Sequence, residues 1–138
     1  MKLELKDFDS VNLHDSKLLN VEERFEFVRL EIDEAIIYLP VKGHDCTAWI
    51  IRGCLLECSG VTGSEKKEWA DTRPKQWRDS HLATPVTNPA LPIHEISSNE
   101  VVDSFLIIGG FTRLKNWVTW RITAKNFELN WKKREEFK

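Results

Sequence analysis

The clearest pattern of hydrophobic and polar positions lies in the last quarter of the chain. Residues 118–123 and 127–131 place apolar side chains at every second position, and this period of two predicts half-buried β-strands. A two-residue turn at 125–126 would join them as an antiparallel hairpin. Its register would place three apolar pairs on one face of the sheet: Ala124 with Phe127, Ile122 with Leu129, and Trp120 with Trp131.

The first third of the chain predicts a second hairpin. Residues 18–21 and 25–32 are apolar stretches separated by the charged residues 22–24, and the later stretch alternates from Val28 onward. The aromatic residues before Val28 have the opposite parity. We therefore expect a bulge or a change of face near Phe27.

Two further apolar stretches follow this hairpin. Residues 35–41 contain Pro40, which has no N–H to donate, so this stretch belongs at a sheet edge or a strand end. Residues 46–51 and 54–61 are compatible with buried strands. Gly53 between them predicts a bend or a bulge.

Residues 62–92 interrupt the strand pattern and predict a long irregular segment. Few apolar positions are periodic there, and prolines occur at positions 74, 85, 89 and 92. Thr62 and Glu65 have the spacing of a capping box, which predicts one or two helical turns through Trp69 that end before Pro74. A segment this long inside a compact domain is usually functional or mobile.

Two more strands are predicted beyond this segment. Residues 93–96 and 101–108 are apolar stretches, and the glycines at 109–110 are expected to form the turn that leads into the final hairpin. Ser97 and Glu100 have capping-box spacing, so a short helix there is the rival interpretation.

The chain as a whole predicts one antiparallel domain over residues 1–138. We expect an all-β fold, or α+β if one short helix forms, built as a sandwich or half-open barrel of roughly seven to nine strands. A chain of 138 residues buries roughly two-thirds of the surface that its unfolded form exposes, enough for a core without staples. Six tryptophans supply much of the apolar area that such a core needs.

Charge and cysteine usage restrict the function classes. A net charge of −2 gives no field for gathering phosphates, which disfavours nucleic-acid binding. No apolar run approaches the roughly 20 residues that span a bilayer, and the first residues lack the apolar stretch of a secretory signal. Three cysteines, an odd number, suit a reducing compartment. We therefore expect a cytoplasmic protein that binds neither nucleic acid nor membrane.

The adjacent residues His14 and Asp15 are the first candidates for chemistry. A carboxylate beside an imidazole can set its tautomer and raise its basicity. Adjacent residues on a strand point to opposite faces, so the pair cooperates only if the chain turns there. In the structural alternative, which we favour, Asp15 caps a turn by accepting hydrogen bonds from backbone N–H groups, while His14 packs beside the first strand.

Four potential zinc ligands lie within fifteen residues: His44, Cys46, Cys54 and Cys58. Their spacing does not match the C-x-x-C or H-x3-5-H pairs of structural zinc sites. Cys54 and Cys58 would share one face of a strand about 13 Å apart, too far for a single ion. We expect buried cysteines that pack as hydrophobes, and no resident metal or cofactor.

Four residues of the irregular segment combine aromatic anchors with charged neighbours: Trp69, Asp71, Trp77 and Arg78. These residue types are enriched at protein interfaces, so we take them as candidate partner-binding residues. In the alternative interpretation, both indoles pin the segment onto the sheet.

Residues 13–16, with the sequence Leu-His-Asp-Ser, and the hairpin that follows resemble the N-terminal signature of small bacterial β-rich families. Residues 122–124 and 127–129 are similar to the closing hairpin of those families, and the matches together cover about a third of the chain. Some of these families are grouped with the immunity proteins of polymorphic and contact-dependent toxin systems. They share no catalytic residues, so the resemblance implies a cytoplasmic binding protein whose variable loops contact a partner.

The sequence therefore predicts a noncatalytic protein-binding module, in hypothesis an immunity protein that occludes the active site of a toxin. Two alternatives stay open. A small metal-dependent hydrolase or metal-binding protein would use His14 and Asp15, with His44 as a further ligand. A self-associating structural module would pair its exposed sheet edges, with an oligomeric state that the sequence does not specify.

Overall fold

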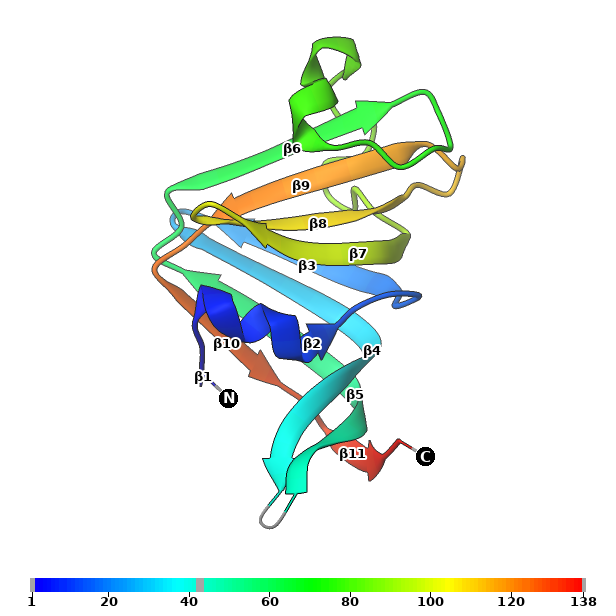
Figure 1. Cartoon of the computed structure of the whole chain (residues 1–138). Helices are drawn as coiled ribbons and strands as arrows, with labels where there is room; N and C mark the ends of the chain where they lie inside the picture. Colours follow the sequence, from blue (N-terminus) through cyan, green and yellow to red (C-terminus); the bar gives the residue numbers. More distant parts are fainter. Residues whose placement is uncertain (1, 42–43, 138) are drawn as a thin grey trace.

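The structure is a computed structural model that describes residues 2–41 and 44–137. This part of the chain is all-β and antiparallel, as the sequence predicts, with eleven strands and two short 3-10 helices (Figure 1). The elements are β1 Lys2–Leu3, η1 Leu5–Ser10, β2 Val11–Asn12, β3 Leu18–Arg24, β4 Phe27–Val41, β5 His44–Ser59, β6 Gly63–Trp69, η2 Trp77–Leu82, β7 Glu95–Val102, β8 Phe105–Phe111, β9 Trp117–Thr123, β10 Asn126–Asn130 and β11 Lys133–Glu136.

The strands form two sheets. The larger one, sheet A, has the order β1-β10-β5-β4-β2, with β3 paired to β4 and β11 paired to β5. The smaller one, sheet B, has the order β6-β9-β8-β7. Backbone hydrogen bonds between residues 15–18 and the start of β7 also join the two sheets at one side, where Lys17 and Glu95 form a bridge.

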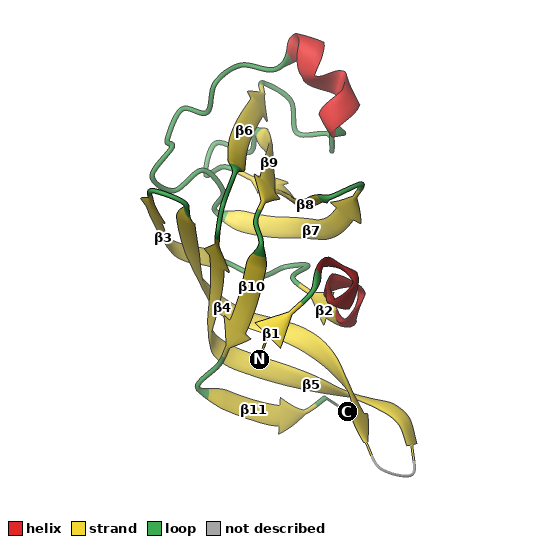
Figure 2. Ribbon diagram, turned by 90° about the vertical axis from the view of Figure 1, so that its left-hand side faces the viewer, coloured by secondary structure: helices red, strands yellow, loops and turns green. Residues whose placement is uncertain are grey.

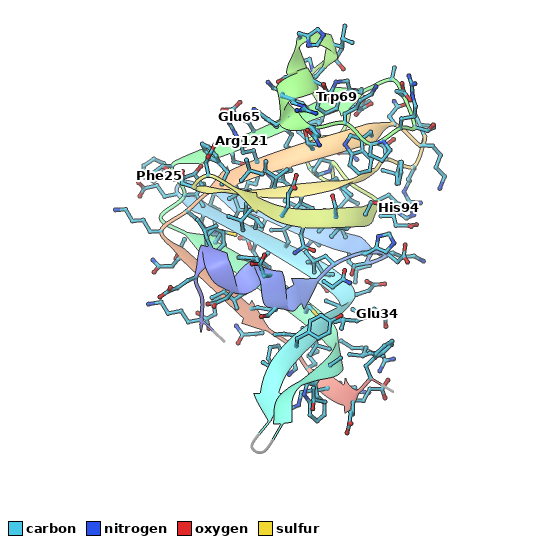
Figure 3. All side chains as sticks on the ribbon, viewed as in Figure 1. Phe25, Glu34, Glu65, Trp69, His94 and Arg121 are labelled. Atoms are coloured by element: carbon cyan, nitrogen blue, oxygen red, sulfur yellow. The ribbon has the colours of Figure 1, made fainter. Side chains whose placement is uncertain are left out.

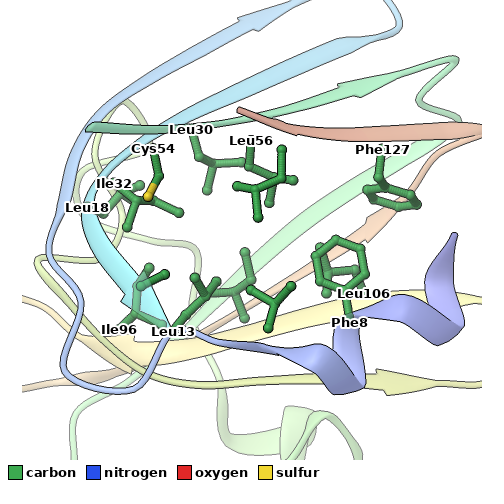
Figure 4. Packing of buried hydrophobic residues seen from close by; sticks show 14 of the residues in the cluster. Phe8, Leu13, Leu18, Leu30, Ile32, Cys54, Leu56, Ile96, Leu106 and Phe127 are labelled. Carbon is green, nitrogen blue, oxygen red and sulfur yellow. The ribbon is translucent and has the colours of Figure 1, made fainter. Parts of the chain in front are cut away.

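The hydrophobic core lies between the two sheets (Figures 2 and 4). One cluster of buried side chains draws on β4, β5 and β10 from sheet A and on β8 and β9 from sheet B. The 3-10 helix η1 also contributes, because the ring of Phe8 packs edge-on against Phe127 with ring centroids 5.3 Å apart. Trp120 is fully buried, and its indole N–H donates to the hydroxyl of Ser64 at 2.9 Å.

The hairpin expected near the start of the chain is confirmed as β3 and β4. It turns at residues 25–26, so the charged residues 22–24 are the end of β3 and not a break. The bulge expected near Phe27 is wrong, because Phe27 pairs in regular register with Arg24 of β3 and with Ser59 of β5. The register of the β3–β4 pair shifts instead between Leu18 and Asn20.

The strands β4 and β5 form a long hairpin that projects from the body of the molecule (Figure 1). Pro40 lies one residue from the end of β4, which is the strand-end position predicted. Gly53 adopts a φ of 66° inside β5, where a non-glycine residue would be strained. It also marks a change of neighbour, since β11 pairs with β5 as far as Arg52 and β10 pairs with it from Leu55. The backbone therefore departs from regular strand geometry at Gly53, but the bulge is absent, because β4 and β5 keep one register on both sides of this residue.

The predicted final hairpin is wrong, although both of its strands exist. β9 pairs with β6 and β8 in sheet B, whereas β10 pairs with β5 and β1 in sheet A. Ile122 and Phe127 both point into the core, but from opposite sheets. The two residues between these strands carry the chain from one sheet to the other, and the apolar pattern is the same in either arrangement.

The irregular segment is shorter than predicted. Residues 63–69 form β6, an edge strand of sheet B, so the helical turns predicted from Thr62 through Trp69 are wrong. Polar side chains occur on both faces of β6, and this hides the period of two; such charged edges also oppose pairing with other chains. The one short helix of this region lies later, as η2.

The turn predicted at the paired glycines is also wrong. Gly109 and Gly110 lie inside β8, and the turn that leads from β8 into β9 is at residues 113–114. A Cβ on Gly110 would lie 2.3 Å from the carbonyl oxygen of Glu95, so glycine is present for close approach of two strands. The rival helix beginning at Ser97 is wrong as well, because that stretch belongs to β7.

Candidate partner-binding surface

The residues between β6 and β7, called segment 70–94 below, begin on the outer face of sheet B, the face turned away from the core. Trp117 donates its indole N–H to the carbonyl oxygen of Lys75 at 2.9 Å. Trp69, which pairs with Trp117 across β6 and β9, donates its indole N–H to the carbonyl oxygen of Asp79 at 3.1 Å. Two buried indoles therefore hold the backbone of the first half of this segment against the sheet.

The helix η2 belongs to this first half and carries several exposed side chains. Gln76 and Asp79 form a reciprocal capping box, in which the carboxylate of Asp79 accepts the backbone N–H of Gln76 at 3.0 Å. Both views of the ribbon place η2 beyond β6, at the end of the molecule furthest from the projecting β4–β5 hairpin (Figures 1 and 2). The helix is thus fixed at its start by its own side chains and beneath by tryptophans.

A stack of cations and aromatic rings joins η2 to the strands below it. The guanidinium of Arg121 lies 4.4 Å from the ring centroid of Trp77 and 4.4 Å from that of Phe105. Lys67 approaches the Trp77 ring to 4.3 Å, and Glu65 accepts a hydrogen bond from Arg121 at 2.9 Å (Figure 3). Each such cation–π contact is worth about 0.5–1 kcal/mol near a surface. The half-buried Trp77 is therefore oriented by the strands on which it rests.

Asp71 forms an ion pair within the segment. Its carboxylate accepts hydrogen bonds from the guanidinium of Arg73, one of them at 2.8 Å, and lies 3.5 Å from the ammonium of Lys75. The hydrogen bonds from Arg73 are the main reason that the pKa of Asp71 lies well below its ordinary value. Asp71 is thereby held as a charged group at the start of the segment.

The four predicted contact residues divide into two kinds. Trp69 is only 2% exposed and lies beneath the segment, so in this conformation it positions the surface and contacts no partner directly. Asp71 and Trp77 are partly exposed, and Arg78 is exposed with no ion pair among the residues described. The pinning role proposed for both indoles thus describes Trp69 well, while Trp77 lies at the surface.

The His14-Asp15 pair lies in a turn, and Asp15 adopts a φ of 66°. The imidazole Nδ1 lies 2.8 Å from the carbonyl oxygen of Ser97, and because a carbonyl only accepts, Nδ1 carries a hydrogen. The other ring nitrogen lies 3.6 Å from the Asp15 carboxylate, and both side chains are mostly exposed. Asn12, not Asp15, caps the turn by accepting the backbone N–H of His14 at 2.8 Å.

The cysteines that the structure describes are buried. Burial raises the pKa of the Cys54 thiol to about 12, with a smaller contribution from the nearby carboxylates of Asp33 and Glu34. Burial also raises the pKa of the Cys58 thiol to about 12. The side chains of His44 and Cys46 lie outside the described part, so the structure does not test the four-ligand set. Among the described residues, no group of three or more His, Cys, Asp or Glu side chains is placed to hold a metal ion.

Comparisons with known proteins found no matching family model, no matching curated protein and no matching solved structure. None of the helices in the described ranges has the length and apolar character needed to cross a membrane.

Sequence reasoning missed four members of the stack beneath Trp77: Glu65, Lys67, Phe105 and Arg121. The signal that could have found the two residues in β6 is the alternation of that strand, since Glu65, Lys67 and Trp69 lie on one face once this stretch is taken as a strand. The helix expected there placed these residues on a 3.6-residue period, which separates Lys67 from the other two.

Proposed function

We propose that this protein is a noncatalytic protein-binding module, and that it acts as an immunity protein that neutralises a bacterial toxin in the cytoplasm. The observation that carries the binding role is the position of Trp77 and Arg78 on a segment whose backbone is bonded to two buried indoles. Recognition residues are commonly carried by loops that a rigid scaffold positions. Tryptophan and arginine are also the residue types that most often dominate binding energy.

The immunity role adds the resemblance of residues 13–16 to immunity-type families. The likeness of residues 122–129 to a closing hairpin does not support it, because these two strands lie in separate sheets. The cytoplasmic location is supported by Cys54 and Cys58, which are buried as free thiols in a fold that uses no disulfide between them. The alternative of a hydrolase built on His14 and Asp15 stays a prediction of the sequence.

The test uses the product of the neighbouring open reading frame as the partner, with affinity measured by calorimetry and protection measured as growth of cells that express it. We expect Trp77→Ala and Arg78→Ala each to weaken binding by about tenfold or more and to reduce protection. A matched control is Trp49→Ala in sheet A, since Trp49 also carries a stacked arginine, Arg134, at 4.4 Å.

Unfolding curves for each variant separate loss of contact from loss of fold. If the two segment variants remain folded and bind like the wild type, or if the Trp49 variant loses as much affinity, this surface is not the interface. If the neighbouring protein neither binds nor inhibits growth, the immunity role is refuted.

A further inference from the structure

A small cavity lies on the other side of β6 from the Trp77 stack. Successive side chains of a strand point to opposite faces, so Glu68 faces inward while Trp69 faces outward. The second half of segment 70–94 lies beside the edge strand β6. Thr84 and Glu68 form an antiparallel backbone bridge there. Behind this bridge, Glu68, residues 87–94 and the turn at 112–114 enclose a cavity of about 140 Å³.

The carboxylate of Glu68 forms the polar wall of this cavity and is only 5% exposed. It accepts hydrogen bonds from the Thr87 backbone N–H at 3.1 Å, the Thr87 hydroxyl at 3.2 Å and the Asn116 amide at 2.9 Å. All three donors are neutral, and no lysine, arginine or histidine of the described ranges forms an ion pair with it. Buried carboxylates are normally paired with a cation or a metal, so this one lacks the usual counter-charge.

Asn88, His94 and Thr112 also line the cavity, and apolar side chains complete its walls and suit a hydrocarbon chain. Leu91, Pro92 and Leu114 line the cavity, and Leu114 is 79% exposed at its rim. A cavity near 150 Å³ holds a molecule the size of benzene, whereas sites for drug-sized ligands occupy about 300–1,000 Å³. The cavity therefore has room for one side chain and not for a nucleotide or a similar ligand.

We propose that this cavity receives a single lysine side chain from a protein partner, with its methylenes against Leu91 and Leu114 and its ammonium on Glu68. This inference rests on the proposed binding function and adds the chemistry of one contact. Lysine fits better than arginine because both carboxylate oxygens already accept hydrogen bonds. An ammonium needs one remaining lone pair, whereas a guanidinium binds best in line with both oxygens.

Arg113 also lines the cavity, and its charge opposes a cation. It is exposed and has no ion pair with Glu68 or with any other residue described. Removing it as Arg113→Ala should therefore tighten binding of a lysine by a few-fold. Unchanged or weaker binding in this variant would contradict an ammonium seated beside Glu68.

The first experiment needs no partner. The capped amino acid Nα-acetyl-lysine N-methylamide is titrated into the full chain, and the amide resonances of Thr87 and of the Asn116 side chain are followed by NMR. We expect saturable shifts with a millimolar Kd, and at least tenfold weaker binding of the capped norleucine analogue, which lacks the ammonium. Absence of saturation, or equal binding of the two probes, would overturn the proposal without any variant.

The variants Glu68→Gln and Glu100→Gln form a matched pair, because each removes one carboxylate from a strand of sheet B, and Glu100 is an exposed residue of β7 outside the cavity. Glutamine at position 68 keeps all three hydrogen bonds if the Asn116 amide reverses, so the fold should survive. We expect Glu68→Gln to lose lysine binding and Glu100→Gln to keep it within twofold. Equal losses would mean that only the overall charge matters, which would refute the site.

Two further results distinguish this inference from the proposed function. Binding of n-butylamine without binding of the capped lysine would assign the cavity to a free amine and reject a polypeptide occupant. If a partner binds through Trp77 and Arg78 but is unaffected by Glu68→Gln, the lysine contact is refuted while the binding function stands. If the capped lysine binds as expected and no partner protein is found, the lysine site stands while the proposed binding function is refuted.

Discussion

The two faces of sheet B are buried by different means. On the inner face, Val118, Trp120 and Ile122 are fully buried against sheet A, in the cluster that forms the core. On the outer face, Trp117 and Thr119 are almost as inaccessible, but they lie beneath a segment held by hydrogen bonds and cation–π contacts. Alternate residues of one strand, β9, thus belong to two kinds of interior.

This difference bears on where the molecule can change at low cost. Apolar packing between two sheets is lost only when the whole domain unfolds, whereas a segment held by a few polar contacts can open by itself. A binding surface placed on the segment can therefore vary without disturbing the core.

The largest effect is expected on the inner face, at Trp120. Trp120→Ala removes a fully buried indole and the hydrogen bond to Ser64, and it should lower the free energy of unfolding by about 3–5 kcal/mol. Urea denaturation followed by far-UV circular dichroism measures this loss. A loss below about 1 kcal/mol would mean that the space between the sheets is not tightly packed.

A second substitution that should disturb packing on the inner face is Gly110→Ala. The added methyl would lie 2.3 Å from the carbonyl oxygen of Glu95 and 2.6 Å from the side chain of Ile93, so β8 and its neighbours must move apart. We expect destabilisation of about 1–3 kcal/mol in the same denaturation assay. Gly63→Ala is the control, because its nearest neighbour would be 3.6 Å away. Equal effects at the two positions would contradict the close approach at Gly110.

An intermediate effect is expected on the outer face. Trp117→Phe keeps an aromatic ring but removes the N–H that bonds to Lys75, and it should cost about 1 kcal/mol. Hydrogen exchange should speed up in residues 70–82 while the core strands keep their protection. Trp49→Phe in sheet A serves as the comparison and should leave this segment unchanged. Uniform acceleration across the domain would show that the segment does not open independently.

The smallest effect concerns acid. Because the pKa of Asp71 lies below its ordinary value of 3.8, its carboxylate stabilises the folded state fully above about pH 4. That contribution is lost as the pH falls through the folded-state pKa, where the native state takes up the proton. We expect the stability of the wild type to fall more steeply below pH 4 than that of Asp71→Asn, with parallel curves above pH 5. Parallel curves throughout would show that the exposed pair with Arg73 contributes nothing.

The sequence predicted the class of fold because alternation reports which side of a strand is buried. Alternation does not report which strand lies beside it. For this reason the sequence predicts a hairpin of β9 with β10, whereas the two strands belong to separate sheets. At Ile122 and Phe127 the pattern is satisfied equally well by a hairpin or by a crossing between sheets. The turn predicted at Gly109 and Gly110 is wrong for a related reason. Glycine is required both in tight turns and where strands approach closely, and the sequence does not distinguish the two.

The sequence nominates Trp69 and Trp77 together as candidate contact residues but does not distinguish their positions. Both tryptophans of the irregular segment have the composition of an anchor, and nothing local separates the buried Trp69 from the half-buried Trp77. Their roles depend on pairing between β6 and β9, which sets Trp69 beside Trp117. The sequence gives no sign that Glu68 is buried, because its burial depends on residues 87–94, which are distant in sequence and lie over it.

The pairing of β1 with β10 ties the order of synthesis to the completion of the fold. Leu3 pairs with Phe127, and Phe8 packs on the same phenylalanine, so both residues gain this partner only after residue 127 has been translated. Such distant pairings slow folding because most of the chain must be brought together first. A nascent chain stalled before residue 126 would leave Leu3 and Phe8 uncovered, as targets for chaperones or for aggregation.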